Sequence, residues 1–199
     1  MTDLERQKLI TEFETLLQKT GREGIDRILD FIRKSDFYTA PASTRFHGSY
    51  DGGLLEHSLN VYRRLEQKMT TDPIWIQVAE EKGYTNENYI ITALLHDLCK
   101  TYYYTTEMRN KKDETGKWIQ VPFYTVDDKI PLGHGCKSVF MIEEYIRLKP
   151  CERYAIRWHM GPYDVTPGEQ YTLGNAMELH PLVLAMHEAD VEATHIIEA

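Results

Sequence analysis

Six residues of the types that bind divalent metals are spread along the chain. They are His57, His96, Asp97, His134, His159 and Asp190. Imidazole nitrogens and carboxylate oxygens without thiolates suit Mn, Fe, Co, Ni or Zn ions, whereas Mg²⁺ prefers oxygen ligands. Any one of these residues alone has a structural explanation, as a hydrogen-bonded core histidine, a helix cap or one half of an ion pair. Taken together, they predict a metal centre.

The run ALLHDLCK, residues 93–100, brings a histidine, an aspartate and a lysine to the end of an apolar stretch. Burying charged groups costs free energy unless they are paired or coordinate a metal. On a helix, His96 and Asp97 would point about 100° apart, so both could reach a metal against the same flank. The run therefore favours a metal site in the interior of the protein.

Most of the segments that carry these residues are predicted to be helices, because apolar residues recur at helical spacing along most of the chain. The predicted helices lie at residues 9–17, 25–32, 54–69, 88–100, 133–149, 151–160 and from Pro181 onwards. A long irregular segment between the second and third helices contains turn-forming and aromatic residues. We expect this segment to be an ordered loop.

One segment departs from the helical pattern. Residues of about 101–130 are rich in aromatic and β-branched side chains on both sides of KDETGK, which predicts a β-hairpin with Gly116 in its turn. The hairpin either forms a small sheet that covers the helices, or uses one or two of its rings to stack a nucleobase. The predicted fold class is therefore mainly α, a helical bundle with one inserted β-hairpin.

The composition limits the classes of function. The 199 residues show no linker and predict a single domain. The net charge of -8 argues against binding duplex nucleic acid, but it leaves small nucleotides and short single strands as partners. Three cysteines without CxxC spacing fit a reducing cytoplasm, and we expect neither a signal peptide nor a membrane segment. Nothing in the sequence indicates an oligomeric state.

The order His, His-Asp, His, His, Asp on a helical chain resembles the HD superfamily of metal-dependent phosphohydrolases. The stretches GGLLEHSLNV, ALLHDLCK and GHG are particularly similar to the HD domain of YhaM-type 3'-5' exoribonucleases. They are similar also to the small stand-alone HD hydrolases of Firmicutes and their phages. The resemblance implies one HD domain over residues 1–199. Residues 1–50 would supply N-terminal helices and a pocket-rim loop, and residues 51–199 the HD core.

The resemblance also implies roles for the six metal-binding candidates. The ligands of one metal would be His57, His96, Asp97 and Asp190. His134 and His159 would hold a second metal, with Asp97 bridging the two ions. Two such ions, about 3.5–4 Å apart, would hold a bridging water as the nucleophile that attacks phosphorus. Lys100 would neutralise charge on the phosphate, although a lysine at a helix end is also typical of a solvated surface.

Four further side chains are candidate substrate contacts: Arg153, Arg157, Arg45 and Tyr50. The first two precede His159 and could bind phosphate through bidentate hydrogen bonds, but arginines near Glu152 are usually surface ion pairs. Arg45 and Tyr50, together with His47, come just before the first ligand and could form the rim of the pocket. His187, one turn before Asp190, could orient a ligand.

These expectations describe a cytoplasmic, metal-dependent phosphohydrolase that acts on a phosphomonoester or phosphodiester of a nucleotide or short oligonucleotide. A 3'-5' single-strand exonuclease is the alternative among enzymes. The negative charge and the absence of a preceding oligonucleotide-binding β-barrel argue against it. A non-catalytic regulatory module that binds a nucleotide or metal is the alternative from another class. The presence of all six candidate ligands favours an enzyme.

Overall fold

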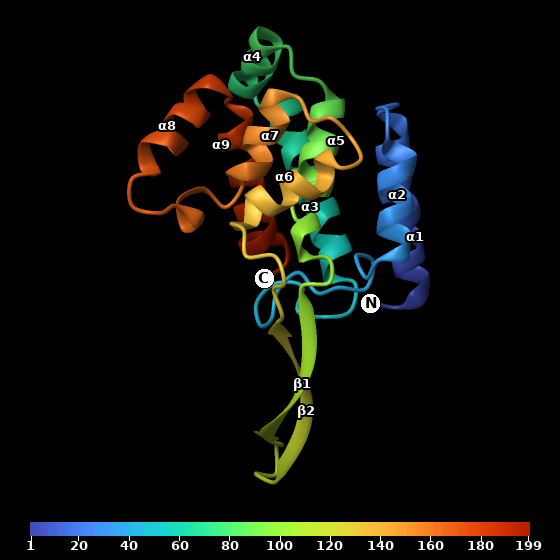
Figure 1. Ribbon diagram of the computed structural model, residues 1–199. Helices are drawn as coiled ribbons and strands as arrows, with labels where there is room; N and C mark the ends of the chain where they lie inside the picture. Colours follow the sequence, from blue (N-terminus) through green and yellow to red (C-terminus); the bar gives the residue numbers. More distant parts are fainter.

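The computed structural model describes residues 1–199. Nine α-helices and one antiparallel β-hairpin make up the chain (Figure 1). The helices are α1 (Asp3–Lys19), α2 (Ile25–Lys34), α3 (Gly53–Thr71), α4 (Pro73–Lys82), α5 (Asn86–Leu95), α6 (His134–Glu143), α7 (Pro150–Arg157), α8 (Gln170–Leu179) and α9 (Leu182–Glu192). None of them is both long and apolar enough to span a bilayer. This architecture confirms the predicted class, a mainly helical bundle with one inserted hairpin.

Helix α3 lies at the centre of the bundle. It packs against α5 and α9, while α7 packs against α5, α6 and α9. Every side chain of α5 from Asn88 to Leu95 is buried, as expected of a helix that is apolar nearly all round. The buried apolar side chains form a continuous cluster that extends to Phe13 and Leu17 of α1. The helices that build the core are thus the ones that carry the candidate ligands.

Three predicted helices end earlier than expected, among them α6, which ends at Glu143 instead of at about residue 149. Helix α5 ends at Leu95, and Leu98–Lys100 form a short 3-10 turn. The His96 imidazole bonds the carbonyl of Ala93, which is one of the carbonyls left free where a helix ends. Helix α7 likewise ends at Arg157, before His159. His96 and Asp97 therefore lie beyond the end of α5, and the angle of about 100° expected between them on an α-helix does not apply. Helices α4 and α8 were not predicted.

Two glycines let backbone segments approach closely at the starts of helices. A Cβ atom on Gly53 would lie 2.0 Å from the carbonyl oxygen of Gly48, so only glycine lets the preceding loop lie against the start of α3. A Cβ atom on Gly135 would lie 2.2 Å from the carbonyl oxygen of Arg157. The start of α6 therefore lies directly against the end of α7.

The β-hairpin extends away from the helices (Figure 1). Strand β1 (Tyr104–Lys112) pairs with β2 (Trp118–Val126), with Tyr104 opposite Val126 and Lys112 opposite Trp118. Most side chains along both strands are exposed, and the hairpin meets the body at its base, where the Tyr104 hydroxyl donates to the carbonyl of Ala42. The hairpin therefore does not cover the helices, which was one of the two expectations for it.

A buried ion pair connects the N-terminal helices to the core. The side chain of Glu152, at the start of α7, is fully buried. Its carboxylate accepts hydrogen bonds from Arg22 at 2.8 Å, from Asn88 at 2.9 Å and from the backbone N–H of Lys149 at 2.8 Å. Because a buried carboxylate is costly unless it is paired and hydrogen-bonded, Arg22 is needed where it lies.

Candidate metal centre

The fold brings all six predicted ligands together. They come from α3 (His57), the end of α5 (His96 and Asp97), the start of α6 (His134), the segment after α7 (His159) and α9 (Asp190). Four of the six line a cavity of about 320 Å³, and the other two, His96 and His159, are fully buried beside them. The cavity is therefore the place where a substrate could meet a bound metal.

Asp97 lies at the centre of the group. Its Oδ1 atom is 3.1 Å from Nε2 of His134 and 3.6 Å from Nε2 of His159. Its Oδ2 atom is 3.3 Å from Nε2 of His96 and 3.9 Å from Nε2 of His57. The two oxygens of one carboxylate thus face different pairs of histidines.

Within the group, the ligand atoms form three overlapping sets, each with its members within 4.8 Å of one another. The sets are His57–His96–Asp97, His96–His159–Asp190 and Asp97–His134–His159. The first and the third share Asp97, as a bridging carboxylate would require. The second shows that His159 and Asp190, which the resemblance assigns to different metals, also lie within reach of each other.

The two deepest imidazoles direct their Nε2 atoms toward Asp97. Nδ1 of His96 is 2.7 Å from the carbonyl oxygen of Ala93, and Nδ1 of His159 is 2.7 Å from that of Ile156. Because a carbonyl only accepts, each neutral ring has its proton on Nδ1 and a lone pair on Nε2. Both Nε2 atoms, and Oδ1 of Asp97, are buried without a hydrogen-bond partner. Such acceptors are rare in proteins, and a divalent cation would satisfy all three, so these residues fit a bound metal.

The pKa values of His57 and His134 are raised in the metal-free protein. Burial alone would lower the pKa of His57, but hydrogen bonds to Asp190, 3.1 Å away, and to Glu198 raise that pKa to about 9. Burial alone would lower the pKa of His134 as well, but Cys99 and Asp97 beside it raise that pKa to about 9. A metal ion must displace the protons of these imidazoles in order to bind.

Lys100 places a buried positive charge at the cavity wall. Its Nζ is 2.7 Å from Oδ2 of Asp97, and only 8% of the residue is exposed. Burial alone would lower the pKa of Lys100, but the charge of Asp97 raises it, so the amine stays protonated. Lys100 is thus a buried partner of the central carboxylate and not a solvated lysine.

None of the four predicted substrate contacts lines the cavity. Arg153 donates from Nε to Glu143 at 3.0 Å. Arg157 pairs with Asp164 at 3.2 Å and with Glu169 at 3.3 Å. Both arginines therefore follow the alternative reading, in which they form ion pairs with nearby carboxylates.

The loop before α3 forms part of the cavity wall. Ala42, Ser43, Thr44 and His47 line the cavity. Arg45 instead lies over the ring of Phe123 of the hairpin, 5.4 Å from its centroid, and the Tyr50 hydroxyl donates to Glu56. The loop thus forms part of the rim as predicted, but Arg45 and Tyr50 do not line the cavity.

Other cavity residues were not assigned from the sequence. Among them are Tyr103, Tyr163, Thr194 and His195. His187 also lines the cavity, and its Nδ1 is 2.7 Å from the carbonyl oxygen of His159. A signal for Thr194 was present, because it shares the apolar spacing of α9 with Asp190. Tyr103 lies in the connection before β1, Tyr163 in a short 3-10 helix and His195 in the π-helical segment after α9, where α-helical spacing gives no indication.

Comparison with known proteins gives one partial relative. No family model matches the chain, and no solved structure matches it. Over 68 residues the chain is 43% identical to a dihydroneopterin 2',3'-cyclic phosphate phosphodiesterase of Methanocaldococcus jannaschii. The match covers 33% of this chain and 24% of that protein, so the chain spans about a quarter of the relative. A third of the chain is thus similar to part of a phosphodiesterase.

Proposed function

We propose that the chain is an HD-type, metal-dependent phosphohydrolase that cleaves a phosphoester bond of a nucleotide or short oligonucleotide. The central observation is Asp97, whose two oxygens face His134 and His159 on one side and His57 and His96 on the other. The partial likeness to a phosphodiesterase supports the reaction class.

The residues of the site have distinct tasks in this proposal. The six predicted ligands would hold two divalent ions, which supply an activated water and stabilise charge on the phosphate when bound. Lys100 keeps a protonated amine at the cavity wall, held by Asp97 at 2.7 Å, where a phosphate oxygen gains negative charge during the reaction. His187 and the backbone of His159 fix each other by a hydrogen bond beside the ligands.

The cavity is suited to a small substrate. Its volume of about 320 Å³ lies at the lower end of the range for small-molecule sites, about 300–1,000 Å³. Tyr103 and Tyr163 supply aromatic surface at its wall, while His47, Thr194 and His195 supply polar groups. A nucleotide, or the terminal nucleotide of a short single strand, fits these dimensions and this chemistry.

The experiment that tests the function is a hydrolysis screen on the metal-loaded protein. Substrates should include 2',3'-cyclic nucleotides, because the partial relative is named for a 2',3'-cyclic phosphate, together with mononucleotides, cyclic dinucleotides and labelled oligonucleotides. We expect turnover that requires metal and is absent from the Asp97→Asn variant. Metal binding without turnover of any of these would favour the regulatory module instead.

A further inference from the structure

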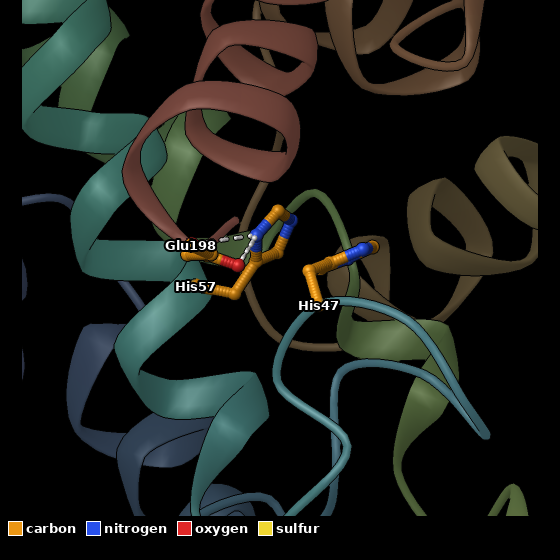
Figure 2. A group of neighbouring side chains, drawn as sticks. All are labelled: His47, His57 and Glu198. Atoms are coloured by element: carbon orange, nitrogen blue, oxygen red, sulfur yellow. Dashed lines mark hydrogen bonds and ion pairs between the residues drawn. The ribbon is translucent and has the colours of Figure 1, made fainter.

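His57 is held by side chains that lie outside the group of six. Figure 2 shows its ring between Glu198 and His47. Nδ1 of His57 is 3.2 Å from both carboxylate oxygens of Glu198, and the ring centroid lies 4.8 Å from that of His47. His57 is 1% exposed and the Glu198 side chain 7%, so this hydrogen bond is shielded from water.

The position of His57 in the interior of α3 explains why it needs such a partner. His96 and His159 follow helix ends, where free backbone carbonyls accept their Nδ1 protons. Inside a helix the carbonyls are already bonded to backbone N–H groups four residues on. His57 therefore has no local backbone acceptor, and the carboxylate of Glu198 takes that place.

Glu198 is itself fixed in position. The amide nitrogen of Asn60, on the next turn of α3, donates to Glu198 at 3.0 Å. Arg63 donates to the amide oxygen of Asn60 at 3.1 Å, which fixes the orientation of the amide. Glu198 follows a π-helical segment, Ala193–Ile197, that continues from α9. π-helical turns occur frequently at functional sites.

The two nitrogens of His57 thus face two carboxylates from the same end of the chain. Asp190 on α9 lies 3.1 Å from Nε2, and Glu198 lies 3.2 Å from Nδ1. We propose that Glu198 is a positioning residue of the metal centre. By accepting the Nδ1 proton it leaves the lone pair on Nε2, on the side of Asp97 and Asp190. The ring of His47 limits rotation on the opposite side. This inference rests on the metal centre of the proposed function.

The inference predicts a selective effect, because His57 reaches only part of the centre. It lies with His96 and Asp97 in one set of ligand atoms and is absent from the set that contains His134. Loss of Glu198 should therefore lower the affinity for one metal ion and leave the affinity for the other nearly unchanged. A general loss of structure would weaken both.

Calorimetric titration of the metal-stripped protein with Mn²⁺ tests this. We expect Glu198→Ala to weaken one of two binding events by about 10–100-fold, the range found when the hydrogen-bond partner of a metal ligand is removed. Glu198→Gln keeps an acceptor oxygen and should recover part of the loss. Ile196→Ala, on the same segment and 74% exposed, is the matched control and should bind like the wild type.

Several outcomes would overturn the inference. Unchanged isotherms for Glu198→Ala, in a protein that binds metal normally, would remove Glu198 from the centre without affecting the proposed function. Equal weakening of both events, with a lower melting temperature of the metal-free variant, would indicate a structural role. Three ions in the wild type and two in Glu198→Ala would make Glu198 a ligand. A wild-type protein that binds no metal would refute the proposed function itself.

Discussion

Oδ1 of Asp97 lies 3.1 Å from Nε2 of His134, although the whole β-hairpin separates these two residues in the chain. Oδ2 of the same carboxylate lies 3.3 Å from His96 and 2.7 Å from Lys100. One side chain thus connects the parts of the site before and after the hairpin. Its negative charge would also offset the repulsion between two dications held close together in a poorly solvated pocket.

Replacing Asp97 tests whether its charge is what the site requires. Asp97→Asn keeps the shape of the side chain but removes the charge, so we expect loss of both metal ions and of hydrolysis. Elemental analysis, turnover and melting temperature measure the three effects. Asp164→Asn, whose carboxylate pairs with Arg157 away from the cavity, is the control and should keep its metal.

A purely structural Asp97 would behave differently. Asparagine would then satisfy the local hydrogen bonds, and only the free energy of unfolding would change, by about 1–3 kcal/mol. An Asp97→Asn variant that retains both metal and turnover would therefore contradict the metallohydrolase proposal.

The metal content of the protein is a second test. With six ligands and a shared aspartate, protein purified without chelator should contain close to two transition-metal ions per chain. Chelation should lower the melting temperature, since an ion present at 100 times its Kd stabilises the fold by about 2.7 kcal/mol. If preparations bind metal tightly but never contain more than one ion per chain, His134 and His159 are not the ligands of a second metal ion.

A third prediction separates Lys100 from the arginines. Lys100→Met should lower kcat by about 10²–10³-fold, the cost of removing one charge-stabilising group from an active site, while metal content stays normal. Arg153→Ala and Arg157→Ala should leave turnover unchanged, because both side chains pair with carboxylates outside the cavity. Steady-state kinetics on all three variants would measure this difference in kcat. A kcat that is unaffected by Lys100→Met would contradict the role of Lys100 in stabilising charge on the phosphate.

The pH dependence of metal binding follows from the raised pKa values of His57 and His134, each about 9. In the metal-free protein the stabilisation from protonated His57 is fully present below about pH 6.5, its ordinary pKa, and is lost as the pH rises through about 9. Metal ions compete with these protons. Metal affinity should therefore rise over the same window, by about tenfold per pH unit for each proton displaced.

Metal titrations of the stripped protein across that window measure this dependence. His134→Ala offers an internal comparison, because it removes one of the two protons and should reduce the slope. An affinity that stays constant between about pH 6.5 and about pH 9 would show that neither imidazole is protonated before metal binds.

The buried pair of Arg22 and Glu152 gives a prediction about the fold alone. Arg22→Met leaves the fully buried carboxylate without its guanidinium partner, which should lower the free energy of unfolding by about 3–5 kcal/mol. Urea denaturation measures this change. Arg33→Met is the control, since its pair with Glu14 is partly exposed and contributes at most about 1 kcal/mol. Equal losses in the two variants would show that burial of Glu152 has no special cost.

Seven of the nine helices and the convergence of the ligands could be predicted because their signals are local. A histidine such as His57, on the apolar face of a helix, must point into the core whatever its neighbours are. The aromatic and β-branched residues around Gly116 likewise indicate strands without reference to the rest of the fold.

The remaining features depend on segments that meet only in the folded chain. Arg157 precedes a predicted ligand and could reach a phosphate, but the loop after α7 supplies Asp164 and Glu169 as nearer partners. Glu198 contacts His57 only because a π-helical segment follows α9, and no sequence periodicity indicates such a turn. The end of α5 before Asp97 was missed because the apolar pattern continues past it.

The paired strands of the hairpin also affect how easily the site assembles during folding. For a flexible loop, the entropy lost on bringing the two ends together grows with the logarithm of its length. Once Tyr104 is paired with Val126, the rest of the hairpin no longer contributes to that loss. The loop that must close to bring Asp97 and His134 together then consists only of the short unpaired stretches on either side of the hairpin. Residues near the turn could be added or removed in pairs without slowing closure, whereas unpairing the base of the hairpin would lengthen the loop at once.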